Sequence, residues 1–195
     1  MARYYTVDRS GKLSTGQEVR PDTDFSASEF FPIQDHFTRQ DLEELTQQLF
    51  PGGLTFHGKK YLLDECLIMT TPLGPAPYVP HIPIIELVSE LVRRVFFAEK
   101  PSRMTSFFAW ATRSEAVAFQ KEYGGGSICE IEAETFFRGD MNLLSLGGSG
   151  VGAMLFAMKY WRGESSPTPR WEYLLVPPVL VMGITNESEL TNLST

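Results

Sequence analysis

Five prolines between Thr70 and Pro83 constrain this chain more than any other feature. They stand at positions 72, 75, 77, 80 and 83. Each proline lacks a backbone N–H and fixes φ, so the segment can form neither a regular helix nor an interior strand. We therefore expect this part of the chain to run extended over the surface, as a loop that could border a site.

A capping sequence predicts a helix before the proline segment. Thr38 has the residue type of an N-cap, and Asp41 lies at the acidic third position. The apolar residues that follow fall on one face: Leu42, Leu45 and Leu49. The sequence Pro51-Gly52-Gly53 should end this amphipathic helix.

The strongest helical pattern in the chain follows the proline segment, because Pro83 suits the first position of a helix. Apolar residues recur with the helical period at Ile84, Leu87, Val88, Leu91, Val92 and Val95. The charged residues between them are Glu86, Glu90, Arg93 and Arg94. We expect the apolar set to face the core and the charged set to face away.

Alternating and capped segments supply the remaining elements. Strands are predicted over residues 4–7, 106–111, 129–133 and 171–184, the last broken at Pro177-Pro178. In the third strand Cys129, Ile131 and Ala133 alternate with three glutamates, which gives one acidic face toward water. Helices are predicted after the capping box 112–115, with a stop at 124–126, and over 151–161.

The length and composition favour a single α+β domain. A chain of 195 residues with 43% hydrophobic content can bury a full core. We expect residues 1–185 to form that domain and residues 186–195 to be a polar tail that frays.

The composition also argues against several kinds of partner. A net charge of −7 without a Lys/Arg cluster argues against binding to nucleic acid. The two cysteines are isolated and the three histidines are scattered, so neither a disulfide framework nor a metal site is predicted. No apolar run approaches the ~20 residues that span a bilayer, and no signal-peptide core is present. A soluble, cytoplasmic protein is expected, or one secreted into a host cytosol without a cleaved leader.

Two segments carry the candidate functional residues. Glu172 is a carboxylate at the head of the apolar strand 171–176, where it either emerges into solvent or borders a cleft. Upstream, Arg103 and Ser106 precede the aromatic pair Phe107-Phe108, and we hypothesise a polar crevice between the two strands. In the structural alternative, Arg103 pairs with a surface acid such as Glu99 or Glu115, and the aromatic residues belong to the core.

A glycine-rich turn at 147–150 precedes the predicted helix at 151–161. Backbone N–H groups at such a turn can cradle a phosphate. The segment lacks the Lys-Ser/Thr of a P-loop, so we favour a flexible turn.

The order of three strands resembles the ADP-ribosyltransferase superfamily. Members of that superfamily bind NAD in a cleft between two small sheets, using an early strand, a middle strand followed by a short helix, and a late strand with a glutamate. In this chain the early strand looks like residues 4–7, and the middle strand with its helix looks like residues 106–109 and 115–119. The late strand looks like residues 171–176. The chain is also similar to a bacterial family of unknown function that shares the sequences at 100–103 and 171–175.

The resemblance implies an α+β fold with two small antiparallel sheets that form a cleft. It also implies the activity of a mono-ADP-ribosyltransferase, which uses NAD as its substrate and needs no metal. Glu172 would be the catalytic residue, gripping the ribose 2′-hydroxyl as oxocarbenium character develops. The implied NAD-binding residues are Tyr5, Thr6, His57, Arg103, Ser106, Phe107 and Phe108.

At the early-strand position where the family carries Arg or His, this chain has Tyr5-Thr6. The anchor for NAD must therefore come from elsewhere, for example from Arg3, His57 or Arg103, or be absent. Arg170, two positions before Glu172, differs from the Glu or Gln of members that modify arginine. The expected acceptor is a protein, as for an effector or toxin, with a nucleic acid, a small molecule or water left open. The alternative is a protein-interaction module without turnover on the same scaffold.

Overall fold

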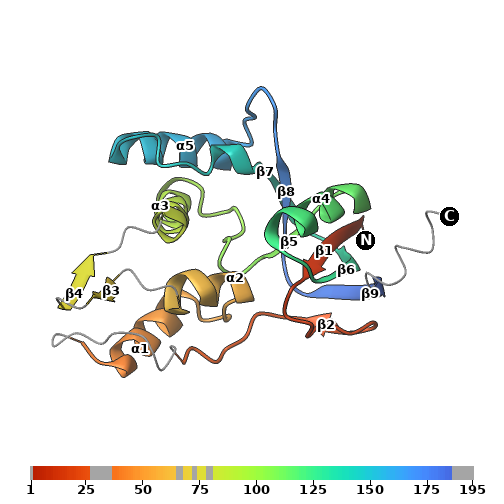
Figure 1. Cartoon of the computed structure of the whole chain (residues 1–195), viewed down its shortest axis with the longest axis horizontal. Helices are drawn as coiled ribbons and strands as arrows, with labels where there is room; N and C mark the ends of the chain where they lie inside the picture. The colour runs from red at the N-terminus through yellow and green to blue at the C-terminus, as the bar shows by residue number, and fades with distance from the viewer. Residues whose placement is uncertain (1, 27–36, 65–67, 72–73, 78–80, 186–195) are drawn as a thin grey trace.

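The structure is a computed structural model that describes residues 2–26, 37–64, 68–71, 74–77 and 81–185 (Figure 1). It has an α+β fold built on two small antiparallel sheets, which agrees with the predicted class. The first sheet has the strand order β1-β6-β9-β2, and the second has the order β5-β8-β7. The predicted tail at 186–195 lies outside the described residues.

The strands of the first sheet are β1 (Ala2–Asp8), β2 (Glu18–Val19), β6 (Ser127–Ala133) and β9 (Val179–Thr185). Those of the second sheet are β5 (Phe107–Ala109), β7 (Phe136–Asp140) and β8 (Trp171–Leu175). The α-helices are α1 (Arg39–Leu49), α2 (Phe56–Lys59), α3 (His81–Phe96), α4 (Arg113–Tyr123) and α5 (Gly150–Arg162). Two shorter helices are the π-helix η1 (Lys60–Asp64) and the 3₁₀-helix η2 (Met141–Leu143).

The two sheets meet at the middle of β1. Tyr5 and Trp110 exchange backbone hydrogen bonds of 2.9 and 2.8 Å, and the Thr6 hydroxyl donates to the Phe108 carbonyl at 2.7 Å. A shared core of Tyr4, Ile131, Leu175 and other buried residues fills the space beside this junction. The sheets are therefore joined through one short bridge rather than through a continuous ladder.

Several local predictions are confirmed. Thr38 and Thr112 both form capping boxes, at the start of α1 and α4. Gly124 ends α4 in the left-handed region, with φ of 88°. The glutamates of β6 alternate with buried Cys129, Ile131 and Ala133 as expected. Local hydrogen bonding and the two-residue period of a strand are sufficient to set these features.

The predicted orientation of α3 is wrong. Glu86 and Glu90 are buried, at 3% and 4% exposure, whereas Leu87, Leu91 and Val95 are 46%, 54% and 71% exposed. Arginine and hydroxyl groups surround the two carboxylates and compensate for their burial. The helix also begins at His81, two residues before Pro83.

Two further predictions need correction. The proline segment includes a strand pair, because β4 (Gly74–Pro77) pairs with β3 (Ile68–Thr71) in a separate two-stranded sheet. Proline is compatible with such an edge strand, and Pro72 and Pro80 lie outside the described residues. The strand predicted over 106–111 is shorter, since β5 ends at Ala109 and Trp110 turns to pair with Tyr5.

The helix α5 contacts β7 of the second sheet, and α3 packs against α5 (Figure 1). Their shared core contains Val92, Tyr160, Trp161 and Leu174, and the Trp161 indole donates to the Ser89 carbonyl at 2.9 Å. Gly139 on β7 lies directly under Tyr160. A Cβ atom at position 139 would overlap the Tyr160 ring and lie 2.7 Å from its hydroxyl oxygen.

This close approach predicts that Gly139→Ala destabilises the protein by about 1–3 kcal/mol, because the Tyr160 ring has no free space into which to move. The free energy of unfolding in urea measures the effect. Gly183→Ala is the matched control, since a Cβ on this second strand glycine meets nothing within 4 Å. Equal stabilities of the two variants would contradict the prediction.

Candidate functional site

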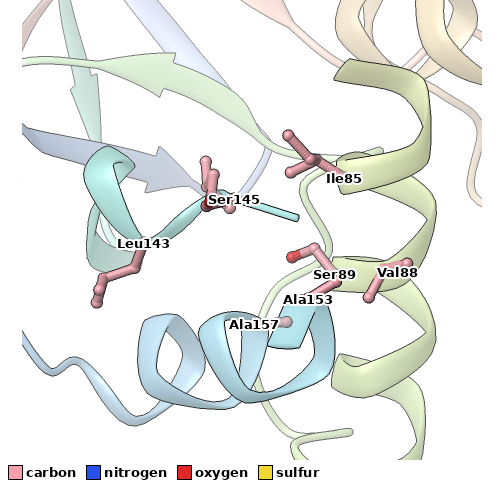
Figure 2. A pocket seen from close by; sticks show the side chains of 8 residues that line it. Ile85, Val88, Ser89, Leu143, Ser145, Ala153 and Ala157 are labelled. Atoms are coloured by element: carbon pink, nitrogen blue, oxygen red, sulfur yellow. The ribbon is translucent and has the colours of Figure 1, made fainter. Parts of the chain in front are cut away.

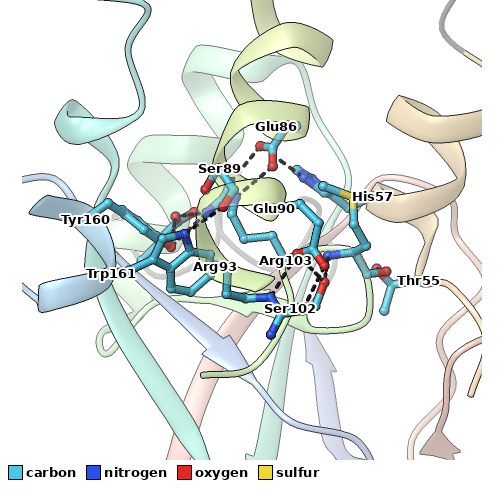
Figure 3. A network of polar contacts seen from close by, with 12 residues as sticks. Thr55, His57, Glu86, Ser89, Glu90, Arg93, Ser102, Arg103, Tyr160 and Trp161 are labelled. Atoms are coloured by element: carbon cyan, nitrogen blue, oxygen red, sulfur yellow. Dashed lines mark hydrogen bonds and ion pairs between the residues drawn. The ribbon is translucent and has the colours of Figure 1, made fainter. Parts of the chain in front are cut away.

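A buried guanidinium links α3, α5 and β8. Arg103 donates from Nε and Nη2 to the two carboxylate oxygens of Glu86, at 2.8 Å each. Its Nη1 donates to the Tyr160 hydroxyl oxygen at 2.8 Å and to Glu172 Oε1. Figure 3 shows Glu86 from α3 and Tyr160 from α5 on different sides of Arg103. We call Arg103, Glu86, Glu172, Tyr160 and His57 the Arg103 network.

Glu172 is held firmly at the start of β8. Its exposure is 2%, and its register partner on β7 is Gly139, which leaves room for the Tyr160 ring. Tyr160 donates to Glu172 Oε1 at 2.7 Å. Within the described ranges, both hydrogen bonds that Glu172 accepts end on Oε1, so Oε2 has no donor from this part of the chain.

The loop before β5 fixes the position of Arg103. Its neighbour Ser102 donates to Glu90 at 2.8 Å and accepts from the Met104 amide at 3.1 Å. Glu90 also accepts from Arg93 and Arg94 of its own helix. Met104 in turn accepts from the Thr55 amide at 3.0 Å, next to α2. The backbone on each side of Arg103 is therefore tied to other parts of the fold.

Charges within the network perturb its acids and bases. Burial alone would raise the pKa of Glu86, but the Arg103 guanidinium and the His57 contact outweigh burial and hold that pKa well below its usual range. Burial opposes the charge on Arg103, yet Glu172 and Glu86 raise its pKa above the usual value. Burial also raises the pKa of the Tyr160 hydroxyl, so Tyr160 remains a neutral donor.

His57 is the most accessible member of this network. Its side chain is 20% exposed, against 4% for Glu86 and Arg103 and 2% for Glu172. His57 Nε2 lies 3.1 Å from Glu86 Oε1, an ion pair when the imidazole is protonated. The imidazole centroid lies 4.3 Å from the Phe108 ring centroid, and the Arg103 guanidinium lies 4.8 Å from the same ring. Both flat groups thus pack on Phe108.

The structure brings together some of the residues predicted for the site. Glu172, Arg103, His57 and Phe108 meet, although they come from three separate segments. The other predicted residues are placed differently, as follows. Tyr5 packs beside Trp110 and Ala116, and Thr6 bonds to the Phe108 carbonyl. Phe107 packs in the core between the sheets. Ser106 is 1% exposed, and its hydroxyl has no hydrogen-bond partner among the residues that the structure describes.

The hypothesis of a polar crevice between these two strands is wrong. β5 and β8 are neighbours in one sheet, with Phe108 opposite Leu174, so their backbone hydrogen bonds leave no gap. Arg103 pairs with Glu86 and Glu172 rather than with Glu99 or Glu115.

Sequence reasoning missed Glu86 and Tyr160. The available signal was the polar stripe Glu86, Ser89 and Glu90 on α3, which occupies one face of a helix.

A small cavity lies between α3, α5 and the segment that contains η2 (Figure 2). Its volume is about 10 Å³, which is enough for about one water molecule. The lining residues labelled in the figure are Ile85, Val88, Ser89, Leu143, Ser145, Ala153 and Ala157. The Ser89 hydroxyl faces this space between α3 and α5 and is buried without a hydrogen-bond partner among the described residues.

Among the described residues, no three His, Cys, Asp or Glu side chains lie together in a way that could hold a metal ion. None of the helices described is both long enough and apolar enough to cross a membrane.

Comparison with known proteins identifies the family of this chain. A family model with the description "Protein of unknown function (DUF2441)" matches residues 4–187. No curated protein is similar enough to the chain to match it.

The lowered pKa of Glu86 predicts how stability depends on pH. As pH falls, the Glu86 carboxylate is protonated in the unfolded state before it is protonated in the folded state. Glu86 therefore contributes its full stabilisation above its ordinary pKa of 4.5, and this contribution declines progressively as the pH falls below that value. Glu86→Gln should cost about 3 kcal/mol at pH 7, and the difference from wild type should shrink toward pH 3. Urea unfolding across this pH range measures both effects. Exposed Glu44 provides the control variant Glu44→Gln, and a pH-independent difference for Glu86→Gln would contradict the prediction.

The Ser89 hydroxyl predicts a gain rather than a loss of stability on substitution. Ser89→Ala should raise the free energy of unfolding by about 1 kcal/mol, because it removes a buried hydroxyl that has no partner in the described part of the chain. Ser102→Ala should lower it, because Ser102 bonds to Glu90 and Met104. Urea unfolding compares the two, and a loss of stability in Ser89→Ala would instead indicate that water occupies the cavity.

Proposed function

The chain belongs to the DUF2441 family of proteins of unknown function, and we propose that it is a mono-ADP-ribosyltransferase that cleaves the nicotinamide glycosidic bond of NAD at Glu172. ADP-ribose would then pass to an acceptor, for which a protein remains our expectation. The observation that carries this proposal is a buried carboxylate with one oxygen anchored and the other without a donor among the described residues.

The chemistry of the reaction suits such a carboxylate. As the bond to nicotinamide breaks, the ribose gains oxocarbenium character, and nicotinamide leaves as a neutral ring. A carboxylate that accepts a hydrogen bond from the ribose 2′-hydroxyl stabilises this positive charge more in the transition state than in the ground state. The effect is larger away from bulk water, where charges interact more strongly.

The partners of Glu172 Oε1 would keep the carboxylate in position. Arg103 and Tyr160 both donate to Oε1, so Oε2 is the oxygen assigned to the sugar. Glu86 would hold Arg103 in place through two parallel hydrogen bonds, which fix the plane of the guanidinium. In this proposal Arg103 positions Glu172 through their hydrogen bond and does not itself contact NAD.

NAD requires space that the closed network does not offer, because Glu172 is 2% exposed. His57 is the group assigned to move, since it is the most accessible member and packs on Phe108. When His57 leaves, the flat nicotinamide ring would take its place on the Phe108 face. The cleft implied by the two-sheet arrangement would open on this side of β5.

A non-catalytic interaction module on the same scaffold remains the second candidate. The observation that favours it is the row Leu87, Leu91 and Val95, which is exposed along α3. Exposed apolar residues in a row are typical of surfaces that bind other proteins.

Release of nicotinamide from NAD tests the proposal. Glu172→Gln keeps an oxygen for Arg103 and Tyr160 but loses the charge, so the rate should fall by a factor on the order of 10² or more. Thermal unfolding of the same samples checks that the variant is folded.

Asp8→Asn provides the matched control. Asp8 is also a buried carboxylate, bonded to the backbone of the turn after β1, and it makes no contact with the network. This variant should lose stability and retain nicotinamide release. If wild-type protein neither binds NAD at millimolar concentration nor releases nicotinamide, the enzyme proposal is wrong and the interaction module is favoured.

A further inference from the structure

A second hollow lies away from the Arg103 network, where the chain passes from one sheet to the other. Its volume is about 350 Å³, within the usual range of ligand pockets. We call it the acidic pocket. Its rim carries Glu18, Glu132 and Glu134, and Val176, Pro177 and Leu180 contribute apolar surface.

The strand register explains the charge pattern of this pocket. Leu180 on β9 lies opposite Glu132 of β6 on one side and opposite Glu18 of β2 on the other. Residues opposite each other in adjacent strands point to the same face of a sheet. A half-buried leucine is therefore flanked by two carboxylates whose strands are about 10 Å apart.

This face of the sheet is open at that end. The neighbours Ile131 and Val181 point into the core, so Glu132 and Leu180 point outward. The helix α4 contacts β1 and β6, and its cluster with Val7 and Ile128 lies at the other end of the face. The acidic pocket thus combines apolar surface with carboxylates of different exposure, because the Glu18 side chain is 53% exposed and the Glu132 side chain is 18% exposed.

The carboxylates are only partly neutralised. Glu132 pairs with Arg3 at 3.2 Å and Glu18 pairs with Arg20 at 2.7 Å, both through arginines that are about two-thirds exposed (64% and 65%). Such exposed pairs are weak and exchange readily with other cations. Glu134 has no ion pair with any residue in the described ranges. A cationic ligand is thus favoured, and a phosphate-rich ligand such as RNA or an anionic membrane is repelled.

We propose that the acidic pocket binds a basic segment of a partner protein, in which an aliphatic side chain lies between two arginines or lysines. The aliphatic side chain packs on Leu180 and Val176, and the two cations approach Glu132 and Glu18, with Glu134 adding attraction. In an extended peptide, residues 1, 3 and 5 share a face. The sequence Arg-Ala-Leu-Ala-Arg therefore matches the pattern of the pocket. This binding does not depend on NAD turnover.

The test uses the full chain and a fluorescent peptide, acetyl-Arg-Ala-Leu-Ala-Arg-amide, with fluorescence anisotropy as the readout. Glu18→Gln and Glu134→Gln should each weaken binding about two- to fivefold, the range expected for exposed charge pairs. Added salt should weaken binding further. The matched control is Glu99→Gln, which removes the same charge from an exposed position after α3 and should have a smaller effect.

A double-mutant cycle tests the apolar contact. Leu180→Ser in the protein and Leu→Ser in the peptide should each weaken binding, and the two together should weaken it less than the product of the single effects. Thermal unfolding confirms that each variant is folded.

Absence of binding by wild type at millimolar peptide overturns the proposal. Equal losses in Glu99→Gln and Glu134→Gln also overturn it, because they would indicate general attraction to a protein of net charge −7. Neither result bears on nicotinamide release, so this inference and the enzyme proposal fail separately.

Discussion

The fold depends on one buried guanidinium that is shared by two carboxylates. Arg103 cannot release its proton, so its burial requires anionic partners within hydrogen-bond distance. Glu86 and Glu172 provide them from a helix and a strand that are far apart in sequence. The geometry of α3 against β8 is therefore fixed by hydrogen bonds with strict directions as well as by apolar packing.

This requirement explains why α3 does not follow its own hydrophobic pattern. The helix must present Glu86 to Arg103 and Glu90 to Ser102, and both carboxylates lie on the same face because they are four residues apart. Leu87 and Leu91 are then turned outward. Burial of two carboxylates without partners would be costly. Three arginines and one hydroxyl bond to them, and the free energy of these contacts outweighs the cost of the apolar area that α3 leaves in contact with water.

Features set by neighbouring residues could be predicted from the sequence. The capping boxes at Thr38 and Thr112 and the alternation of β6 needed only residues within one element. The association of Arg103 with Glu172 was also expected, although as the border of a crevice. Their burial could not be predicted, because it depends on Tyr160 and Glu86, which lie 57 and 17 residues from Arg103. The hydrophobic period of α3 alone assigns Glu86 to the surface, because the sequence of one helix contains no information about a cation elsewhere in the chain.

The attachment of α2 to the backbone beside Arg103 has a mechanical consequence. Thr55 bonds to the Met104 carbonyl through both its amide and its hydroxyl, and Gly58 packs so closely on that carbonyl that a side chain would collide with it. His57 lies between these two contacts. A rigid-body displacement of α2 would pull on the loop that carries the guanidinium, whereas rotation of the imidazole about its own side-chain bonds would not. Rotation of the His57 imidazole is thus a local rearrangement near the surface. Displacement of α2 would loosen the contacts around Arg103 at the centre of the protein.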